Sequence, residues 1–142
     1  MKHLCIDAYE VESALLEDQD LLRRTLKALP ALIGMQRQQE PFLEQIKTSR
    51  PLDDGMSGIL LGDGATTLHV SLHAWPPYHM LNIDLFACQD EIEVQDVLDY
   101  LQYHFQIDSL DMEINEIERA TRSPRPTPIP PPPLVFSHAS PL

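Results

Sequence analysis

Two alternating segments dominate residues 66–88, which run TTLHVSLHAWPPYHMLNIDLFAC. Apolar side chains fall on every second residue of 66–75, and 80–88 repeats the pattern after a Pro-Pro break. This period of two predicts strands with one buried and one polar face. The predicted buried faces carry Leu68, Val70, Leu72 and Ala74, then Leu81, Ile83 and Leu85. The opposite faces carry Thr67, His69, Ser71 and His73, then Asn82, Asp84, Phe86 and Cys88.

The flanking segments extend this pair into a sheet. Residues 56–61 form a short apolar run, and the Gly-Asp-Gly that follows at 62–64 is a strong turn signal. Consecutive strands with short connections predict antiparallel pairing. Residues 3–10 and 110–117 alternate as a first and a last strand. Residues 35–50 stay open, because 35–40 could be a strand but a proline and a polar composition interrupt it.

Apolar residues at helical spacing predict two helices, at 20–33 and 91–105. Asp18 or Asp20 would cap the first helix and Asp90 the second. The order strand, helix, strands, helix, strand predicts an α+β two-layer sandwich, an antiparallel sheet with two helices on one face. The other face would then lie in water, in a ligand cleft or against a partner.

Composition separates a folded part from a tail. The chain has 142 residues, 43% of them apolar, which suits one domain with a core. Eight of its 13 prolines lie in residues 123–142. We therefore expect a domain over 1–120 and a disordered, proline-rich tail over 121–142.

The charge excludes several kinds of partner. Before residue 123 there are 22 acidic and nine basic residues, a net charge of −13. Such a domain repels phosphate backbones and anionic membranes, and it suits cationic or zwitterionic small molecules. Residues 1–7 lack the apolar segment of a signal peptide, and no apolar run reaches the length of a membrane span. With only two cysteines, a cytoplasmic chain with reduced thiols is expected.

The polar face offers two chemical possibilities. His69 and His73 share a face but lie roughly 13 Å apart along a strand, too far to share one zinc ion at about 2 Å. No metal site is therefore expected. Cys88 and His73 could lie on neighbouring strands, where the imidazole would activate the thiol or relay a proton. Alternatively, Cys88 is a small buried residue at a strand end.

Three motifs occur in order along the chain: Gly-x-Ser-Gly at 55–58, His-x-x-x-His-x-Trp-Pro at 69–76, and Asp-x-Phe-x-Cys at 84–88. Together they resemble the prokaryotic S-adenosylmethionine decarboxylase family. The interval from His73 to Cys88 fits the family without a gap. The opening strand and the helix at 91–105 fall where the family has them, so the resemblance spans about residues 2–119.

The resemblance implies a chemistry and a site. Such enzymes cleave themselves at a Glu-Ser bond, and the serine becomes a pyruvoyl group that forms a Schiff base with S-adenosylmethionine and accepts electrons in decarboxylation. The product feeds spermidine synthesis. Ser57 and His73 would correspond to the processing residues and Cys88 to the proton donor. Asp84, Ser71 and Trp75 would contact the ligand in the same cleft of the uncovered face. The family also implies a dimer.

The sequence departs from the family at the cleavage site. The pyruvoyl-forming serine corresponds to Leu68, the glutamate before it to Thr67, and the glutamate after Trp-Pro to Pro77. Leucine has no hydroxyl to start the acyl shift. The interval from Ser57 to His73 is three residues longer than in the family. We therefore expect no pyruvoyl cofactor and an uncut hairpin over 59–75.

Three interpretations follow. The first is a non-processing homologue that acts as a ligand-binding or regulatory subunit and binds S-adenosylmethionine or a related molecule. It would form a homodimer or associate with an active paralogue. The alternative to this interpretation is that the chain inherited the fold without a function. The second is a working decarboxylase with an unusual cleavage site, or acid–base chemistry by Cys88 and His73. The third is an interaction module whose proline tail docks into an aromatic groove.

Overall fold

The computed structural model describes residues 2–34, 39–62, 68–88, 92–118 and 126–134. Within these ranges one antiparallel sheet has the strand order β2-β3-β4-β5-β1-β6. Its strands are β1 (Lys2–Ala8), β2 (Phe42–Ile46), β3 (Gly55–Leu61), β4 (Leu68–Trp75), β5 (Met80–Ala87) and β6 (Met112–Glu118). The helices are α1 (Ser13–Leu16), α2 (Gln19–Leu32) and α3 (Val94–Phe105). None of these helices is long and apolar enough to cross a membrane.

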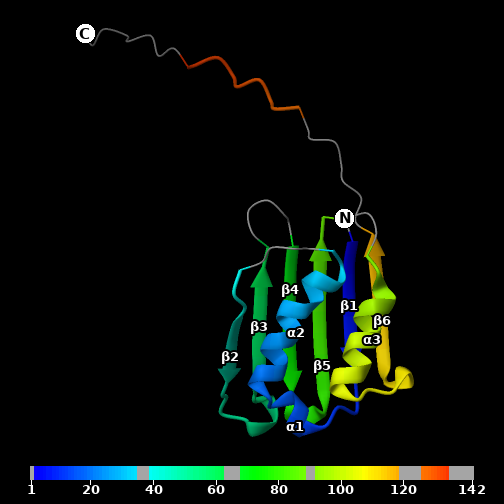
Figure 1. The fold of residues 1–142 in the computed structure, drawn as a ribbon. Helices are drawn as coiled ribbons and strands as arrows, with labels where there is room; N and C mark the ends of the chain where they lie inside the picture. The colour runs from blue at the N-terminus through cyan, green and yellow to red at the C-terminus, as the bar shows by residue number, and fades with distance from the viewer. Residues whose placement is uncertain (1, 35–38, 63–67, 89–91, 119–125, 135–142) are drawn as a thin grey trace, which may run out of the picture.

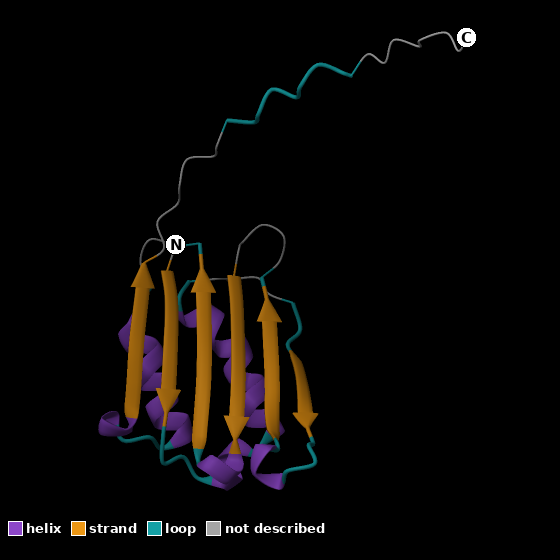
Figure 2. Cartoon of the chain, turned by 180° about the vertical axis from the view of Figure 1, so that it is seen from behind, coloured by secondary structure: helices purple, strands orange, loops and turns teal. Residues whose placement is uncertain are grey.

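The helices cover one face of the sheet, as Figure 1 shows, and the view from behind in Figure 2 shows the other face uncovered. This arrangement confirms the predicted α+β two-layer sandwich. The short helix α1 was not predicted, because four residues are too few to establish a helical period. The uncovered side of the sheet is called the open face below.

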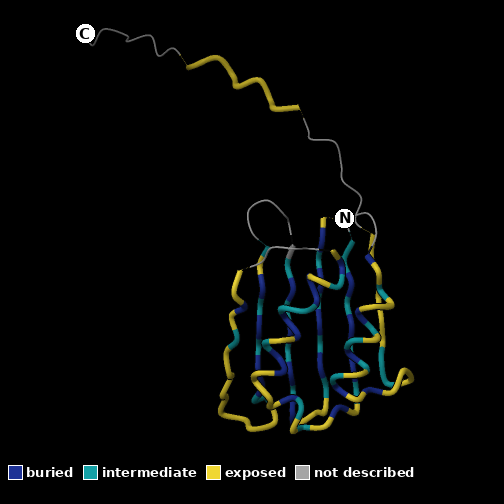
Figure 3. Tube along the Cα trace, viewed as in Figure 1, coloured by how far each residue is buried: buried dark blue, intermediate teal, exposed yellow. Residues whose placement is uncertain are grey.

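The core lies between the sheet and the helices (Figure 3). The alternation in the three central strands is confirmed, since every second side chain is buried there. The apolar stripes of the two long helices pack against these side chains. Buried core residues include Leu4, Ile6, Leu22, Leu26, Val70, Leu72, Ile83, Leu85, Leu101 and Phe105.

The ends of the helices agree with the sequence in part. The carboxylate of Asp18 accepts a hydrogen bond from the Leu21 amide at 3.1 Å, so Asp18 caps α2. The helix α3 begins at Val94, three residues later than predicted, and its N-cap residue Glu93 makes no side-chain cap. The predicted cap Asp90 lies outside the described residues.

The two edge strands are displaced from their predicted positions. The strand β2 follows Pro41, and the described residues Gln39 and Glu40 before it form no strand. Its side chains are mostly exposed, so burial imposes no alternation that a sequence could reveal. The strand β6 begins at Met112, because Leu110 lies in a 3₁₀ turn and is 90% exposed. Three glutamates, at 113, 116 and 118, point from this edge strand.

The connections differ in how they are held. Leu61 pairs with His69 at the end of β3 and β4, but the predicted turn beyond them lies outside the described residues, as does most of the predicted cleavage region. Between β4 and β5 the prolines form a 3₁₀ turn that ends at His79. The His79 Nδ1–H donates to the Val11 carbonyl at 2.9 Å, and the Val11 amide donates to the His79 carbonyl at 2.9 Å.

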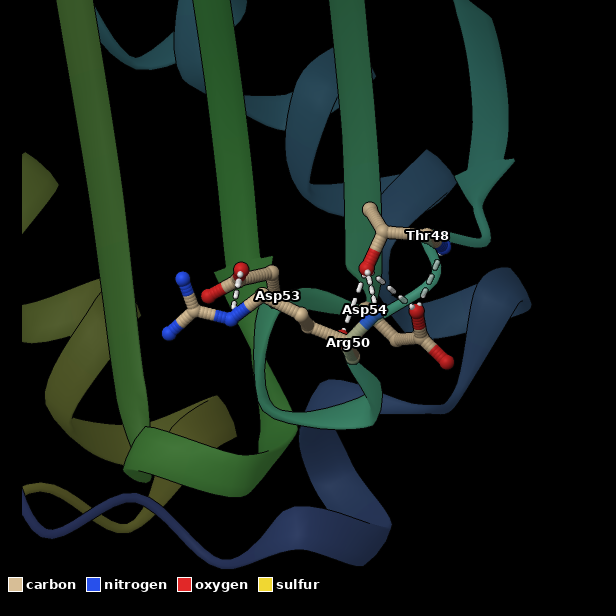
Figure 4. Close-up of polar contacts among 4 residues, drawn as sticks. All are labelled: Thr48, Arg50, Asp53 and Asp54. Carbon is tan, nitrogen blue, oxygen red and sulfur yellow. Dashed lines mark hydrogen bonds and ion pairs between the residues drawn. The ribbon is translucent and has the colours of Figure 1, made fainter.

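The connection from β2 to β3 is fixed by its own polar groups (Figure 4). The Asp54 carboxylate accepts from the Thr48 amide at 2.6 Å. The Thr48 hydroxyl donates to the Arg50 carbonyl at 2.6 Å and accepts from the Arg50 amide at 3.1 Å. These bonds satisfy the backbone of an exposed loop directly before Gly55, the first residue of β3.

Gly55 sets how closely β3 and β4 approach. A Cβ atom at this position would collide with the backbone oxygen of Ala74. Backbone cannot yield as a side-chain end can, so Gly55→Ala should lower the free energy of unfolding by about 1–3 kcal/mol. Urea denaturation measures this loss. Glu44→Ala, on the exposed neighbouring strand, should stay within about 0.5 kcal/mol of wild type. Equal midpoints for the two variants would contradict this packing account.

Candidate functional site on the open face

The antiparallel register arranges the open-face side chains in rows across the strands. Ser57 lies opposite His73, His73 opposite Asn82, and Asn82 opposite Asp7. The next row contains Ile59, Ser71, Asp84 and Cys5. Each row therefore combines side chains from four strands, three of them consecutive in the sequence and the fourth, β1, at the start of the chain.

A continuous set of contacts follows the first row. The Ser57 hydroxyl and the Nδ1 atom of His73 are 2.9 Å apart, and the tautomer of the ring decides which donates. The His73 ring stacks on Trp75, with centroids 6.1 Å apart and an angle of 23°. The Trp75 indole N–H donates to the Asn82 carbonyl at 2.8 Å, and the Asn82 amide donates to Asp7 at 2.6 Å. Part-buried polar groups that satisfy one another in this way are held in fixed orientations.

Two hollows open beside this row. The first has a volume of about 270 Å³ and is lined by Phe42, Glu44, Ser57, Gly58, Ile59, Ser71 and His73. The second has a volume of about 500 Å³ and is lined by His3, His69, Ser71, Asp84 and Phe86. Because Ser71 lines both, the hollows adjoin. Four of the predicted site residues therefore lie on adjoining hollows: Ser57, His73, Ser71 and Asp84.

A second polar cluster lies at the edge of the larger hollow. The Nε2 atom of His3 is 3.1 Å from the Asp84 carboxylate, and the Cys5 sulfur is 3.3 Å from the same nitrogen. The Phe86 ring packs edge-on against His3, with centroids 6.0 Å apart. Sequence reasoning considered neither His3 nor Cys5 for a site.

Cys88 lies apart from the other predicted catalytic residues. His73 pairs with Asn82, whereas Leu68 pairs with Ala87, the residue before Cys88. Cys88 is therefore about 20 Å along the strand from the level of His73. It is also exposed, so the alternative of a small buried cysteine is wrong. Within one chain, the expected Cys88–His73 pair does not form. The proline turn at 76–78 fixes this register, so the sequence did contain the signal.

A third hollow, of about 400 Å³, lies at the end of the sheet where the helix α1 and the 3₁₀ turns meet. Ser13, Lys47, Asp54 and Pro76 are among its lining residues, and the Ser13 hydroxyl donates to the Pro76 carbonyl at 3.0 Å. None of the predicted site residues lines it. It has no evident link to the chemistry of the open face.

Negative charge is concentrated on the open face near β1. Partial desolvation and the charges of Glu113 and Asp7 raise the pKa of Tyr9, whose hydroxyl lies 3.4 Å from Glu113. The phenol thus stays protonated well above neutral pH and donates to Glu113. A surface with this charge favours ligands that carry positive charge.

Residues from each of the three sequence motifs, Ser57, His73 and Asp84, lie on the open face. A model of the S-adenosylmethionine decarboxylase family matches residues 2–120. The chain belongs to the S-adenosylmethionine decarboxylase family. The match covers the sheet and its helices but not the proline-rich segment at 126–134, which has no helix or strand and is exposed.

Individual relatives are distant. The chain is 30% identical to the S-adenosylmethionine decarboxylase proenzyme of Acidithiobacillus ferrooxidans (strain ATCC 53993 / BNL-5-31) over 67 residues, 45% of this chain and 48% of the relative, so the match spans about half of that relative's length. It is 23% identical to the proenzyme of Thermosipho melanesiensis over 101 residues, 71% of each chain. The crystal structure of the adenosylmethionine decarboxylase from Aquifex aeolicus shares the fold, with a TM-score of 0.65 and 17% identity over 89% of this chain and 95% of that one.

Asn82 connects the Trp75 indole to the Asp7 carboxylate, so a substitution at this position tests the contacts of the first row. In Asn82→Asp the amide donor is lost and two carboxylates face each other, so at pH 7 the free energy of unfolding should fall by about 1–3 kcal/mol. Like charge raises the carboxyl pKa in the folded state. The electrostatic part of the penalty should therefore shrink as the pH falls through that raised pKa, and it should be lost by about pH 4, the carboxyl pKa of an unfolded chain.

The fluorescence of Trp75, the only tryptophan of the chain, reports the unfolding. Gln95→Glu is the matched control, because the Gln95 amide donates to Asp99 at 2.7 Å on an exposed helix surface. It should cost no more than about 0.5 kcal/mol. If both variants lose the same free energy of unfolding at pH 7, the contacts of the first row contribute nothing specific to the stability of the domain.

Proposed function

We propose that this chain is a non-processing member of the S-adenosylmethionine decarboxylase family that binds a small molecule on its open face and acts as a ligand-binding or regulatory subunit in polyamine synthesis. One observation carries the proposal. The Ser57–His73 pair is kept at 2.9 Å beside a hollow, while Leu68 occupies the position of the pyruvoyl-forming serine. The pair that corresponds, by the resemblance, to the family's processing residues is thus present without the residue that forms the pyruvoyl group.

The pyruvoyl group that the family implies does not fit this chain. Its formation requires a hydroxyl that attacks the preceding carbonyl, and the side chain of leucine offers none. The residue before Leu68 is Thr67 instead of the family's glutamate. We therefore derive no step through a pyruvoyl group.

S-adenosylmethionine or a related nucleoside or amine is the proposed ligand. Its sulfonium and ammonium groups carry positive charge, and the carboxylates of Glu44 and Asp84 line the two hollows. The Phe42 and Phe86 rings line the same hollows and offer apolar surface for a base or a sulfonium. Trp75 would contact the ligand through its stacking on His73. A few oriented polar groups among apolar side chains are typical of small-molecule sites.

A second chain is part of the proposal. The open face carries exposed apolar side chains at its edges, which a partner would cover. The family resemblance makes that partner a second copy or an active paralogue. Cys88 and His73, which are far apart within one chain, could contribute to one site only across such an interface. We place this role in the cytoplasm, in keeping with two cysteines that form no disulfide with each other.

The alternatives have less support. An active decarboxylase would need an unusual cleavage site at Thr66 or Thr67, which lie outside the described residues. Acid–base chemistry by Cys88 and His73 within one chain is disfavoured by their separation along the sheet. A docking role for the tail has only the exposure of residues 126–134 in its favour. The boundary of the folded domain at residue 120 stays a prediction.

Processing is tested by the mass of the purified chain. Because Leu68 cannot form a pyruvoyl group, a single species near 16.2 kDa is expected. The variant Leu68→Ser tests whether a hydroxyl at this position is sufficient for cleavage, because it restores the hydroxyl while the family's preceding glutamate is still absent. If the unaltered chain yields two fragments, the C-terminal one with a blocked N-terminus, the non-processing assignment is overturned.

Binding is tested by calorimetry with S-adenosylmethionine in the presence of a metal chelator. We expect saturable binding with a dissociation constant at or below about 1 mM, weakened at least tenfold in His73→Ala. His104→Ala on α3, on the opposite side of the sheet, should bind as the unaltered chain does. No heat from any ligand of this class at millimolar concentration would leave a protein–protein role for the open face.

A further inference from the structure

The cluster of His3, Cys5 and Asp84 brings three different metal-binding groups together. Cys5 pairs directly with Asp84 across β1 and β5, and His3 projects from the same face of β1 two residues earlier. The His3 nitrogen is 3.1 Å from the Asp84 oxygen and 3.3 Å from the Cys5 sulfur. All three ligand atoms lie within 4.8 Å of one another.

One ring nitrogen is shared between the two other groups of this cluster. The same ring nitrogen, Nε2 of His3, faces both the carboxylate and the sulfur. A ring nitrogen carries either one proton or one lone pair. With the proton it donates to the carboxylate, and the sulfur is only a weak acceptor. Without the proton it accepts from the thiol, and its lone pair then faces the lone pairs of the carboxylate. A cation between the three atoms attracts all of them.

Two of the three distances between the ligand atoms are close to those around a tetrahedral zinc ion. Zinc bonds of about 2.0 Å to nitrogen or oxygen and about 2.3 Å to sulfur separate the ligand atoms by roughly 3.2–3.7 Å. The two distances from His3 Nε2, 3.1 and 3.3 Å, lie close to that range, and the remaining pair of ligand atoms lies within 4.8 Å. Nitrogen and sulfur ligands favour zinc over magnesium and calcium, which take oxygen ligands. We propose that His3 Nε2, Cys5 Sγ and the Asp84 carboxylate form a zinc-binding site.

The fourth coordination position of such an ion would face the larger hollow of the open face. His3 and Asp84 line the larger hollow, of about 500 Å³, together with His69, Ser71 and Phe86. A zinc ion held by three side chains there keeps one position for water or for an oxygen or nitrogen atom of a small ligand. Three protein ligands and one open position are typical of zinc sites that bind or activate a ligand, whereas structural sites have four. The site thus adds a ligand-binding role to the open face that does not depend on Ser57 or His73.

The site does not require the proposed function. Neither the Ser57–His73 pair nor S-adenosylmethionine takes part in metal binding. The calorimetry with S-adenosylmethionine is done in the presence of a chelator, so it tests binding of the small molecule without metal. The metal titration is done without a chelator. Each proposal can therefore fail while the other stands.

The test uses the full chain, stripped of metal and kept reduced with a phosphine, and titrated with Co²⁺ and then with Zn²⁺. We expect one equivalent of Co²⁺ to give a thiolate-to-metal charge-transfer band in the near ultraviolet and strong visible bands of a tetrahedral ion. Zn²⁺ should remove both with a dissociation constant below about 1 µM. Mg²⁺ should leave the spectrum unchanged. Absence of the charge-transfer band in the unaltered chain overturns the proposal whatever the variants do.

Variants assign the ligands. Cys5→Ser should abolish the charge-transfer band and weaken zinc binding at least about 100-fold, more than the loss of an outer partner does. His3→Gln and Asp84→Asn should weaken it as well. Cys88→Ser and His104→Gln are the matched controls, with an exposed thiol and an imidazole elsewhere, and should bind as the unaltered chain does. Circular dichroism checks that each variant is folded. A band that survives Cys5→Ser and disappears in Cys88→Ser contradicts the assignment.

Discussion

The antiparallel pairing of β1 with β5 determines which side chains meet on the open face. It sets Cys5 against Asp84 and Asp7 against Asn82, and it inserts the first strand of the chain between β5 and β6. Both polar clusters depend on it. Because side chains alternate between faces, a slip of one residue would move Leu4 and Ile6 into water and the polar side chains into the core. The burial of the apolar face thus fixes the chemistry of the other.

The sequence predicted those elements in which the burial of one side produces a regular spacing of apolar residues. Residues 68–75 and 80–87 alternate because one face is covered by helices, and α2 shows its stripe for the same reason. The edge strand β2 was missed because its side chains are mostly exposed on both faces. The start of α3 was misplaced because its N-cap residue Glu93 makes no side-chain cap for a sequence to show.

The site was predictable only where strands adjacent in sequence are also adjacent in space. Ser57 and His73 lie on consecutive strands, and the structure brings them together. The shared face of His3 and Cys5 was visible as alternation, but Asp84 joins them through a pairing between strands separated by most of the domain. Alternation cannot reveal such a pairing. The separation of Cys88 from His73, in contrast, followed from the tight turn between β4 and β5 and could have been deduced.

The glutamates of β6 also bear on how copies of the domain can associate. As an outer strand, β6 has unpaired backbone groups along one side, and such an edge invites the β6 of another copy to extend the sheet. In an antiparallel approach of two such strands, the glutamates at 113, 116 and 118 of the two copies would be brought close together along the shared edge. Their repulsion opposes continuous sheet extension into fibrils at neutral pH and low salt. The glutamates of β6 therefore disfavour edge-to-edge association of copies of the domain.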